Sequence, residues 1–182
     1  SLMKALRAIA DEQIHSRMVA AIIDIAIEFA GAQRGILALR DSEGKLRIEA
    51  EATVDSDETV ILQSSPLDQS EAVSQATINY VSRTLESVVV ADALAVNSPV
   101  PGLDREEYIL RERVRSILCI PIAIGQGDQR TLIGLLYLEN NHLSNCFTDA
   151  RIGALEIISV AAAGRLELSR KAAIDGLTNL YN

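Results

Sequence analysis

The sequence predicts an α+β fold, in which an antiparallel sheet of about six strands carries two long terminal helices on one face. Two observations lead to this fold class. Strand-like segments come in pairs joined by short polar loops that contain glycine, as in β-hairpins; the pairs are residues 35–40 with 45–54 and residues 116–124 with 131–139. Both ends of the chain instead repeat apolar residues every three or four positions, as helices do. Long helices at both ends can pack together on one face of such a sheet.

The N-terminal segment, residues 2–30, is predicted to form one helix. Gly31 follows it at the position where a left-handed residue commonly ends a helix. Its apolar positions are Leu2, Leu6, Ile9, Ile14, Met18, Ile22, Ile25 and Phe29.

The middle of the chain alternates short strands and short helices. Residues 60–62 indicate a third strand, and residues 88–90 a fourth. Asp68 as N-cap and Glu71 three positions later predict a helix that runs to about residue 85. A loop rich in proline follows over residues 91–102, and a second short helix over residues 104–114.

A long final helix is predicted to begin after Thr148, a good N-cap, and to run to about residue 170 or beyond. Small and apolar residues recur along it with alternating spacings of three and four, which is a heptad pattern. This pattern fits a helix that pairs with a second copy of the chain, and it also fits packing on the chain's own sheet or first helix. The residues are Ile152, Leu155, Ser159, Ala162, Leu166, Ser169 and Ala173.

Composition excludes several classes of function. The chain has 182 residues and a net charge of −8 without a basic run, so it is unsuited to nucleic acid or to an anionic membrane surface. No apolar stretch approaches the roughly 20 residues that span a bilayer. Cys119 and Cys146 form no motif, so we expect a reduced, cytoplasmic setting.

Several segments of the chain resemble a GAF domain. Residues 115–122, the strand over residues 132–140 and the helix opening at residues 147–149 carry the main resemblance, and residues 80–84 and 88–93 also fit. The resemblance implies a sensory domain over residues 1–171. Its sheet would have terminal helices on one face, and a pocket for an unknown small-molecule ligand with short helices on the other.

The last eight residues resemble the opening of GGDEF domains, which make cyclic di-GMP from GTP. Asn179 stands where that family usually has glycine, a mild change because asparagine tolerates left-handed backbone. The resemblance implies that residues 172–182 are a linker and the opening motif of a diguanylate cyclase in the same chain. The matching residues are Asp175, Leu177, Thr178, Leu180 and Asn182.

Two alternatives stay open. The GAF-like portion resembles the sensors of histidine kinases equally well, and it could also serve as a ligand-free dimerisation spacer. In each case we expect a homodimer through the terminal helices and no catalytic residues within these 182.

Six side chains are the candidates for the ligand pocket: Tyr80, Asp92, Tyr108, Cys119, Tyr137 and Glu139. Each also has an ordinary structural interpretation. Asp92 can cap a turn, the tyrosines can be half-buried core residues, and Cys119 lies in an apolar strand where a buried thiol is common. Alternation along the strand places Tyr137 and Glu139 on one face, although the sequence does not say which.

No cofactor is evident. The Cys-His pair through which some GAF domains attach a bilin is absent, because Ile120 follows Cys119 and Phe147 follows Cys146. This disfavours a covalent bilin. The two histidines have no second ligand at metal-binding spacing, which disfavours haem and other metals.

Overall fold

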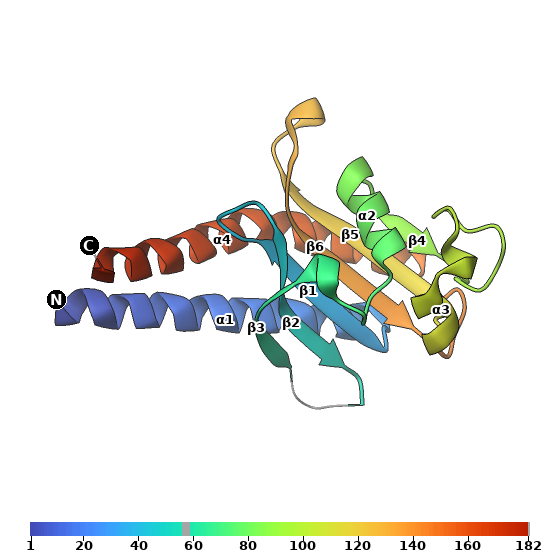
Figure 1. Ribbon diagram of the computed structural model, residues 1–182, viewed down its shortest axis with the longest axis horizontal. Helices are drawn as coiled ribbons and strands as arrows, with labels where there is room; N and C mark the ends of the chain where they lie inside the picture. Colours follow the sequence, from blue (N-terminus) through green and yellow to red (C-terminus); the bar gives the residue numbers. More distant parts are fainter. Residues whose placement is uncertain (56–58, 182) are drawn as a thin grey trace.

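A six-stranded antiparallel sheet, in the order β3-β2-β1-β6-β5-β4, forms the centre of the computed structural model, which describes residues 1–55 and 59–181 (Figure 1). The predicted α+β fold is confirmed. The strands are β1 (Arg34–Arg40), β2 (Leu46–Thr53), β3 (Val60–Pro66), β4 (Val88–Val90), β5 (Ser116–Ile124) and β6 (Thr131–Asn140). The helices are α1 (Leu2–Ala30), α2 (Gln75–Thr84), α3 (Glu107–Glu112) and α4 (Asp149–Tyr181), with single turns η1 (Leu67–Gln69), η2 (Leu103–Arg105) and η3 (Gly127–Gln129).

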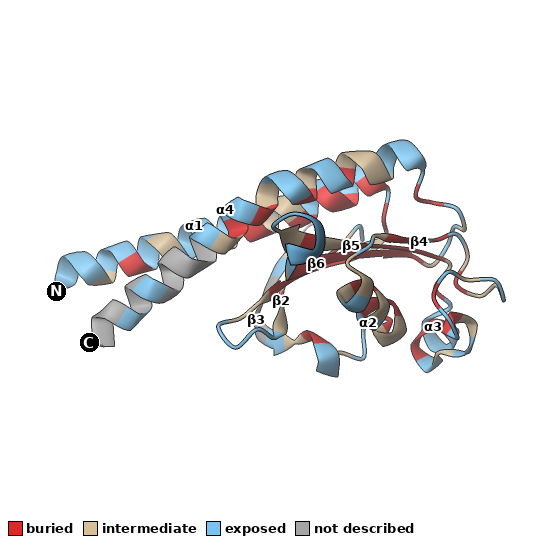
Figure 2. Ribbon diagram, turned by 90° about the horizontal axis from the view of Figure 1, so that it is seen from above, coloured by how far each residue is buried: buried red, intermediate tan, exposed pale blue. Residues whose placement is uncertain are grey.

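The two long helices, α1 and α4, lie side by side on one face of the sheet, and α2 and α3 lie on the other (Figure 2). Their ends follow from local chemistry. The Ser1 side chain accepts the Lys4 N–H at the start of α1, and Gly31 ends that helix with a left-handed φ of 71°. Thr148 accepts the Arg151 N–H through its hydroxyl at 3.4 Å and so caps α4 as predicted.

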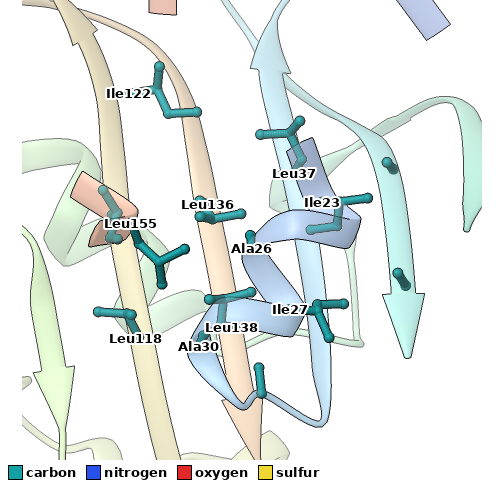
Figure 3. Close-up of a cluster of buried hydrophobic side chains, with 14 of the residues drawn as sticks. Ile23, Ala26, Ile27, Ala30, Leu37, Leu118, Ile122, Leu136, Leu138 and Leu155 are labelled. Atoms are coloured by element: carbon teal, nitrogen blue, oxygen red, sulfur yellow. The ribbon is translucent and has the colours of Figure 1, made fainter. Parts of the chain in front are cut away.

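Each face of the sheet buries its own core. Alternate residues of β6 serve the two sides: Leu136 and Leu138 point toward α1 and α4, whereas Leu135 and Tyr137 point toward α2 and α3. Figure 3 shows Leu136 and Leu138 with Ile23 of α1 and other residues of the first core. Because both faces are covered, neighbouring residues of β6 pack in different cores. A shift of this strand on one face therefore also moves side chains on the other.

Gly134 is required by the close approach of β1 to β6. A Cβ at this position would lie 2.5 Å from the Ala38 carbonyl oxygen and 2.8 Å from Leu39 Cδ2. Strands at this spacing therefore tolerate only glycine here.

The helix predicted to begin at Asp68 begins instead at Gln75, so this prediction was wrong. Asp68 lies in the single turn η1, and Ser74 is the N-cap, its side chain accepting the Thr77 N–H. The Gln75 side chain also binds the Leu67 carbonyl, which keeps η1 folded beside the helix instead of continuous with it. The second short helix is likewise shorter than predicted, since η2 precedes α3.

The predicted heptad positions of α4 face the protein's own interior. Leu155 and Leu166 are completely buried and Ser159 nearly so, while Ala162 is half-buried. This is the arrangement expected of packing on the chain's own sheet and first helix. Ser169 and Ala173 lie outside the side chains that the structure describes.

The helix α4 continues beyond the sheet to Tyr181, so residues 172–181 are helical. Asp175 and Thr178 of the predicted motif are exposed there. The side chains of Leu177 and Leu180, and the whole of Asn182, lie outside the described part. Among the described residues, no helix is long and apolar enough to cross a membrane.

Candidate functional site

Three of the six predicted pocket residues meet on the face that α2 and α3 cover. The Tyr108 hydroxyl lies 2.7 and 2.8 Å from the two carboxylate oxygens of Glu139, and the Tyr137 hydroxyl lies 2.8 Å from Glu139 Oε2. All three side chains are buried; Glu139 is only 2% exposed. The sequence had left open which face Tyr137 and Glu139 occupy, and the structure places both on the α2–α3 side.

A fourth member, Arg34, was missed by the sequence analysis. It opens β1, and its backbone pairs with that of Glu139 across the β1–β6 ladder. Its Nη1 donates to Glu139 Oε1 at 3.1 Å and to the Tyr108 hydroxyl oxygen at 3.2 Å, and its Nε donates to Glu51 at 2.7 Å. An arginine directly opposite a glutamate in neighbouring strands is the signal that could have revealed it.

The donors and acceptors of this network are matched. The Tyr108 hydroxyl donates to Glu139 and accepts from Arg34. The Tyr137 hydroxyl donates to Glu139 and accepts the Ser74 backbone N–H at 3.2 Å. The buried Glu139 carboxylate thus has three donors, which is how a charge in a protein interior is held. Arg34 Nη2 is buried without a partner among the described atoms.

The network shifts the proton affinities of its members. Burial and then the Glu139 carboxylate raise the pKa of both Tyr108 and Tyr137. Burial lowers the pKa of Arg34, but the neighbouring Glu139, Tyr108 and Glu51 outweigh this and raise it overall. The arginine therefore stays charged and the tyrosines stay neutral at physiological pH, so the network holds one positive charge and two hydroxyl donors in fixed positions.

The network also holds the two short helices in place. Ser74 is the N-cap of α2, so its bond to Tyr137 ties the start of α2 to β6. The Glu106 carboxylate, at the start of α3, accepts the Ala76 N–H of α2 at 2.8 Å. Tyr108 connects α3 to the sheet. A molecule that displaces either helix must therefore rearrange this network.

The other three candidates stand apart from it. Asp92 forms a two-pronged ion pair with Arg115, at 3.0 and 3.1 Å, and accepts the Leu94 N–H, so it fixes the loop after β4. Tyr80 is half-buried under the Arg83 guanidinium. Cys119 is fully buried opposite Tyr137 in the β5–β6 ladder, and burial raises the pKa of its thiol. Within the part of the chain that the structure describes, no group of three acidic, histidine or cysteine side chains could hold a metal.

Two hollows lie near these elements. One, of about 150 Å³, is between η1, α2 and the start of β2, on the same side of the sheet as the network. The other, of about 390 Å³, lies beside the end of α1, outside the α2–α3 face.

Long helices on one face of an antiparallel sheet, and short helices over a buried polar network on the other, form the α+β architecture that the sequence predicts. The model of the GAF domain family matches residues 16–166. The chain therefore belongs to the GAF domain family.

Known structures agree on the fold. The blue-light-absorbing form of the PixJ GAF domain from Thermosynechococcus elongatus is 13% identical, with a TM-score of 0.61 over 94% of each chain. The GAF domain region of a putative membrane protein from Geobacter sulfurreducens is 14% identical, with a TM-score of 0.59 over 90% of this chain and 97% of the other. At these identities the likeness concerns the fold alone.

One curated relative is similar in sequence. Hybrid signal transduction histidine kinase G from Dictyostelium discoideum is 34% identical over 82 residues. The match covers 45% of this chain and only 2% of the relative.

Proposed function

We propose that this GAF domain is the cytoplasmic regulatory module of a diguanylate cyclase, with the cyclase domain following α4 in the same chain. The observation that carries the proposal is the route from the network to α4. Tyr137 and Glu139 hold α2 and α3 on one face of β6, and the intervening Leu138 packs in the core shared with α1 and α4 on the other. The helix α4 then runs without a break into the residues that resemble a GGDEF opening.

Regulation requires a ligand that binds two arrangements of the domain with different affinity. In one arrangement the network is closed as described, and α2 and α3 sit on the sheet. A ligand that moves α2 would break the Tyr137 to Ser74 bond and shift β6 against the α1–α4 pair. The helix α4 would then change position relative to a second copy.

The proposed dimer uses the outward face of α4, since the inward face is buried. Ile157, Val160 and Leu168 are 72%, 76% and 73% exposed. They continue along one side of the helix with Gly164 between them, at spacings of three and four. Exposed apolar residues in such a row favour helix pairing. Cyclic di-GMP forms from two GTP molecules with release of two pyrophosphates, and a dimer would bring together two cyclase domains that each hold one GTP.

The test begins with the protein that contains this chain together with the residues after Asn182. We expect a GGDEF-type active-site motif there and conversion of GTP to cyclic di-GMP. Ile157→Lys should weaken dimerisation in sedimentation analysis and lower cyclase activity at least tenfold. Val96→Lys, at a position that is 89% exposed but outside the helices, is the control and should change neither. Absence of the motif, or a fully active Ile157→Lys monomer, would overturn the proposal.

A histidine kinase sensor is the second candidate function. It is supported by the similarity to the histidine kinase segment from Dictyostelium. The test is phosphoryl transfer from labelled ATP to a histidine of the full protein. Such transfer without turnover of GTP would support the histidine kinase and contradict the cyclase.

A further inference from the structure

A small hollow on the α2 side of the sheet has the chemistry of a binding site. Its volume is about 150 Å³, equal to about five water molecules at ~30 Å³ each. A hollow of this volume fits a small molecule more closely than a nucleotide or a tetrapyrrole. The start of β2, the turn η1 and one side of α2 line it.

The walls of the hollow are fixed by hydrogen bonds. Gln75 of α2 donates from Nε2 to the Leu67 carbonyl at 2.7 Å and to the Ser70 carbonyl at 3.0 Å, which ties η1 to the helix. Lys45 is held at its backbone, because its N–H donates to the Asp41 carboxylate at 2.9 Å and its carbonyl accepts the Asp41 N–H at 2.7 Å. A site with walls set in advance loses little ordering entropy when it binds.

Opposite charges line this hollow without neutralising each other. Lys45 brings an ammonium group and Asp68 a carboxylate, and both side chains are exposed to solvent at the mouth. No ion pair joins them to each other or to any other described side chain. The half-buried Leu46 offers apolar surface to the hollow, and the buried Leu67 and Ile78 back it, at 2% and 4% exposed.

We propose that this pocket binds a small zwitterionic amino acid with a short aliphatic side chain. Its carboxylate would pair with Lys45, its ammonium with Asp68, and its side chain would lie against the half-buried Leu46. Binding in this pocket does not depend on the proposed function; only the effect of binding on the cyclase rests on it. Ile78 belongs to α2, whose N-cap Ser74 is tied to Tyr137, so an occupant pressing on α2 acts on the network described above.

The test is calorimetric titration of the chain with glycine, alanine, valine and leucine. We expect saturable binding, strongest for an aliphatic member. The matched probes valinamide, which lacks the carboxylate, and N-acetylvaline, which lacks the ammonium, should bind at least tenfold more weakly than valine. Absence of saturable binding by all four amino acids, or equal binding of valine and its blocked forms, would overturn the assignment.

Single substitutions locate the site. Lys45→Met and Asp68→Asn should each weaken amino-acid binding at least tenfold, whereas Lys4→Met and Asp128→Asn, remote in α1 and in the β5–β6 loop, should not. All four positions are exposed, so the fold should survive, and circular dichroism checks this. Unchanged binding by both pocket variants refutes the site.

The two proposals fail separately. Amino-acid binding that is lost in Lys45→Met, in a full-length protein without cyclase activity, supports the pocket and removes the proposed function. A dimer-dependent cyclase whose chain binds none of the four amino acids supports the proposed function and removes the pocket.

Discussion

Replacing Tyr137 by phenylalanine removes one hydroxyl from the centre of the buried network. The change deletes the donation to Glu139, at 2.8 Å, and the acceptance from the Ser74 N–H, at 3.2 Å. Glu139 keeps Tyr108 and Arg34 as donors, which limits the loss on that side. Among the described residues, the buried Ser74 N–H has no other hydrogen-bond acceptor, and a buried donor without a partner costs about 1–3 kcal/mol.

With the charged hydrogen bond included, we expect the free energy of unfolding to fall by about 3 kcal/mol. For a domain of this size, each kcal/mol lowers Tm by about 2–4 °C, so the expected decrease is about 6–12 °C. Chemical denaturation with urea, followed by circular dichroism, measures the free energy directly. The matched control is Tyr80→Phe. The Tyr80 hydroxyl has no hydrogen bond recorded within the described part of the chain, so this change should cost less than about 0.5 kcal/mol. If the two variants lose equal stability, the matched network is not what holds α2 in place.

Three further outcomes follow from the same structure. The pKa values of Tyr108 and Tyr137 are raised in the fold, so these hydroxyls stabilise it fully below the unfolded tyrosine pKa of about 10. Above that pH, the free energy of unfolding should fall by about 1.4 kcal/mol per pH unit for each tyrosine. Gly134→Ala should destabilise the domain through the contact with β1, whereas Gly164→Ala, in open space on α4, should stabilise it by about 1 kcal/mol, both measured by urea unfolding. Co-expression with a bilin should leave no covalent adduct on Cys119, as read by zinc-induced fluorescence in a denaturing gel, because burial keeps this thiol protonated and inaccessible.

A different result would contradict each of these three predictions. A double phenylalanine variant of Tyr108 and Tyr137 that keeps the full alkaline slope would assign the loss of stability to other groups. A stable Gly134→Ala variant would mean that β1 and β6 can separate slightly. A bilin adduct located at Cys119, and not at Cys146, would mean that the sheet opens far enough to expose the Cys119 thiol.

The sequence predicted the long elements well because their patterns are local. Residues 2–30 form one helix closed by Gly31 as predicted, and the hairpin around residues 125–130 has its turn residues in place. The predicted apolar stripe of this helix was wrong, however, because Leu6, Ile9 and Phe29 are exposed. The side chains that face the sheet are instead those of Val19, Ile23 and Ile27. Asp68 and Ser74 both had the chemistry of an N-cap, however, and the choice between them was made by distant residues. Tyr137 binds the Ser74 N–H, and Gln75 holds η1 apart from the helix. No local pattern contains that information.

The site was predictable in part for a similar reason. The resemblance to a GAF domain, together with alternation along β6, pointed to Tyr137 and Glu139. Arg34 lies one residue before the strand that the sequence predicts over residues 35–40. Its role depends on the register that sets it opposite Glu139, a pairing between residues far apart in the chain.

The two ends of the chain lie at the same end of the α1–α4 pair, because the two helices run in opposite directions beside each other (Figure 1). A pulling force applied between these ends would not load the helix contacts all at once. It would peel α1 from α4 one turn after another, and the ladder between β1, which follows α1, and β6, which precedes α4, would carry force only afterwards. Held in this way, the domain is a compliant, extensible joint under tension and not a rigid strut.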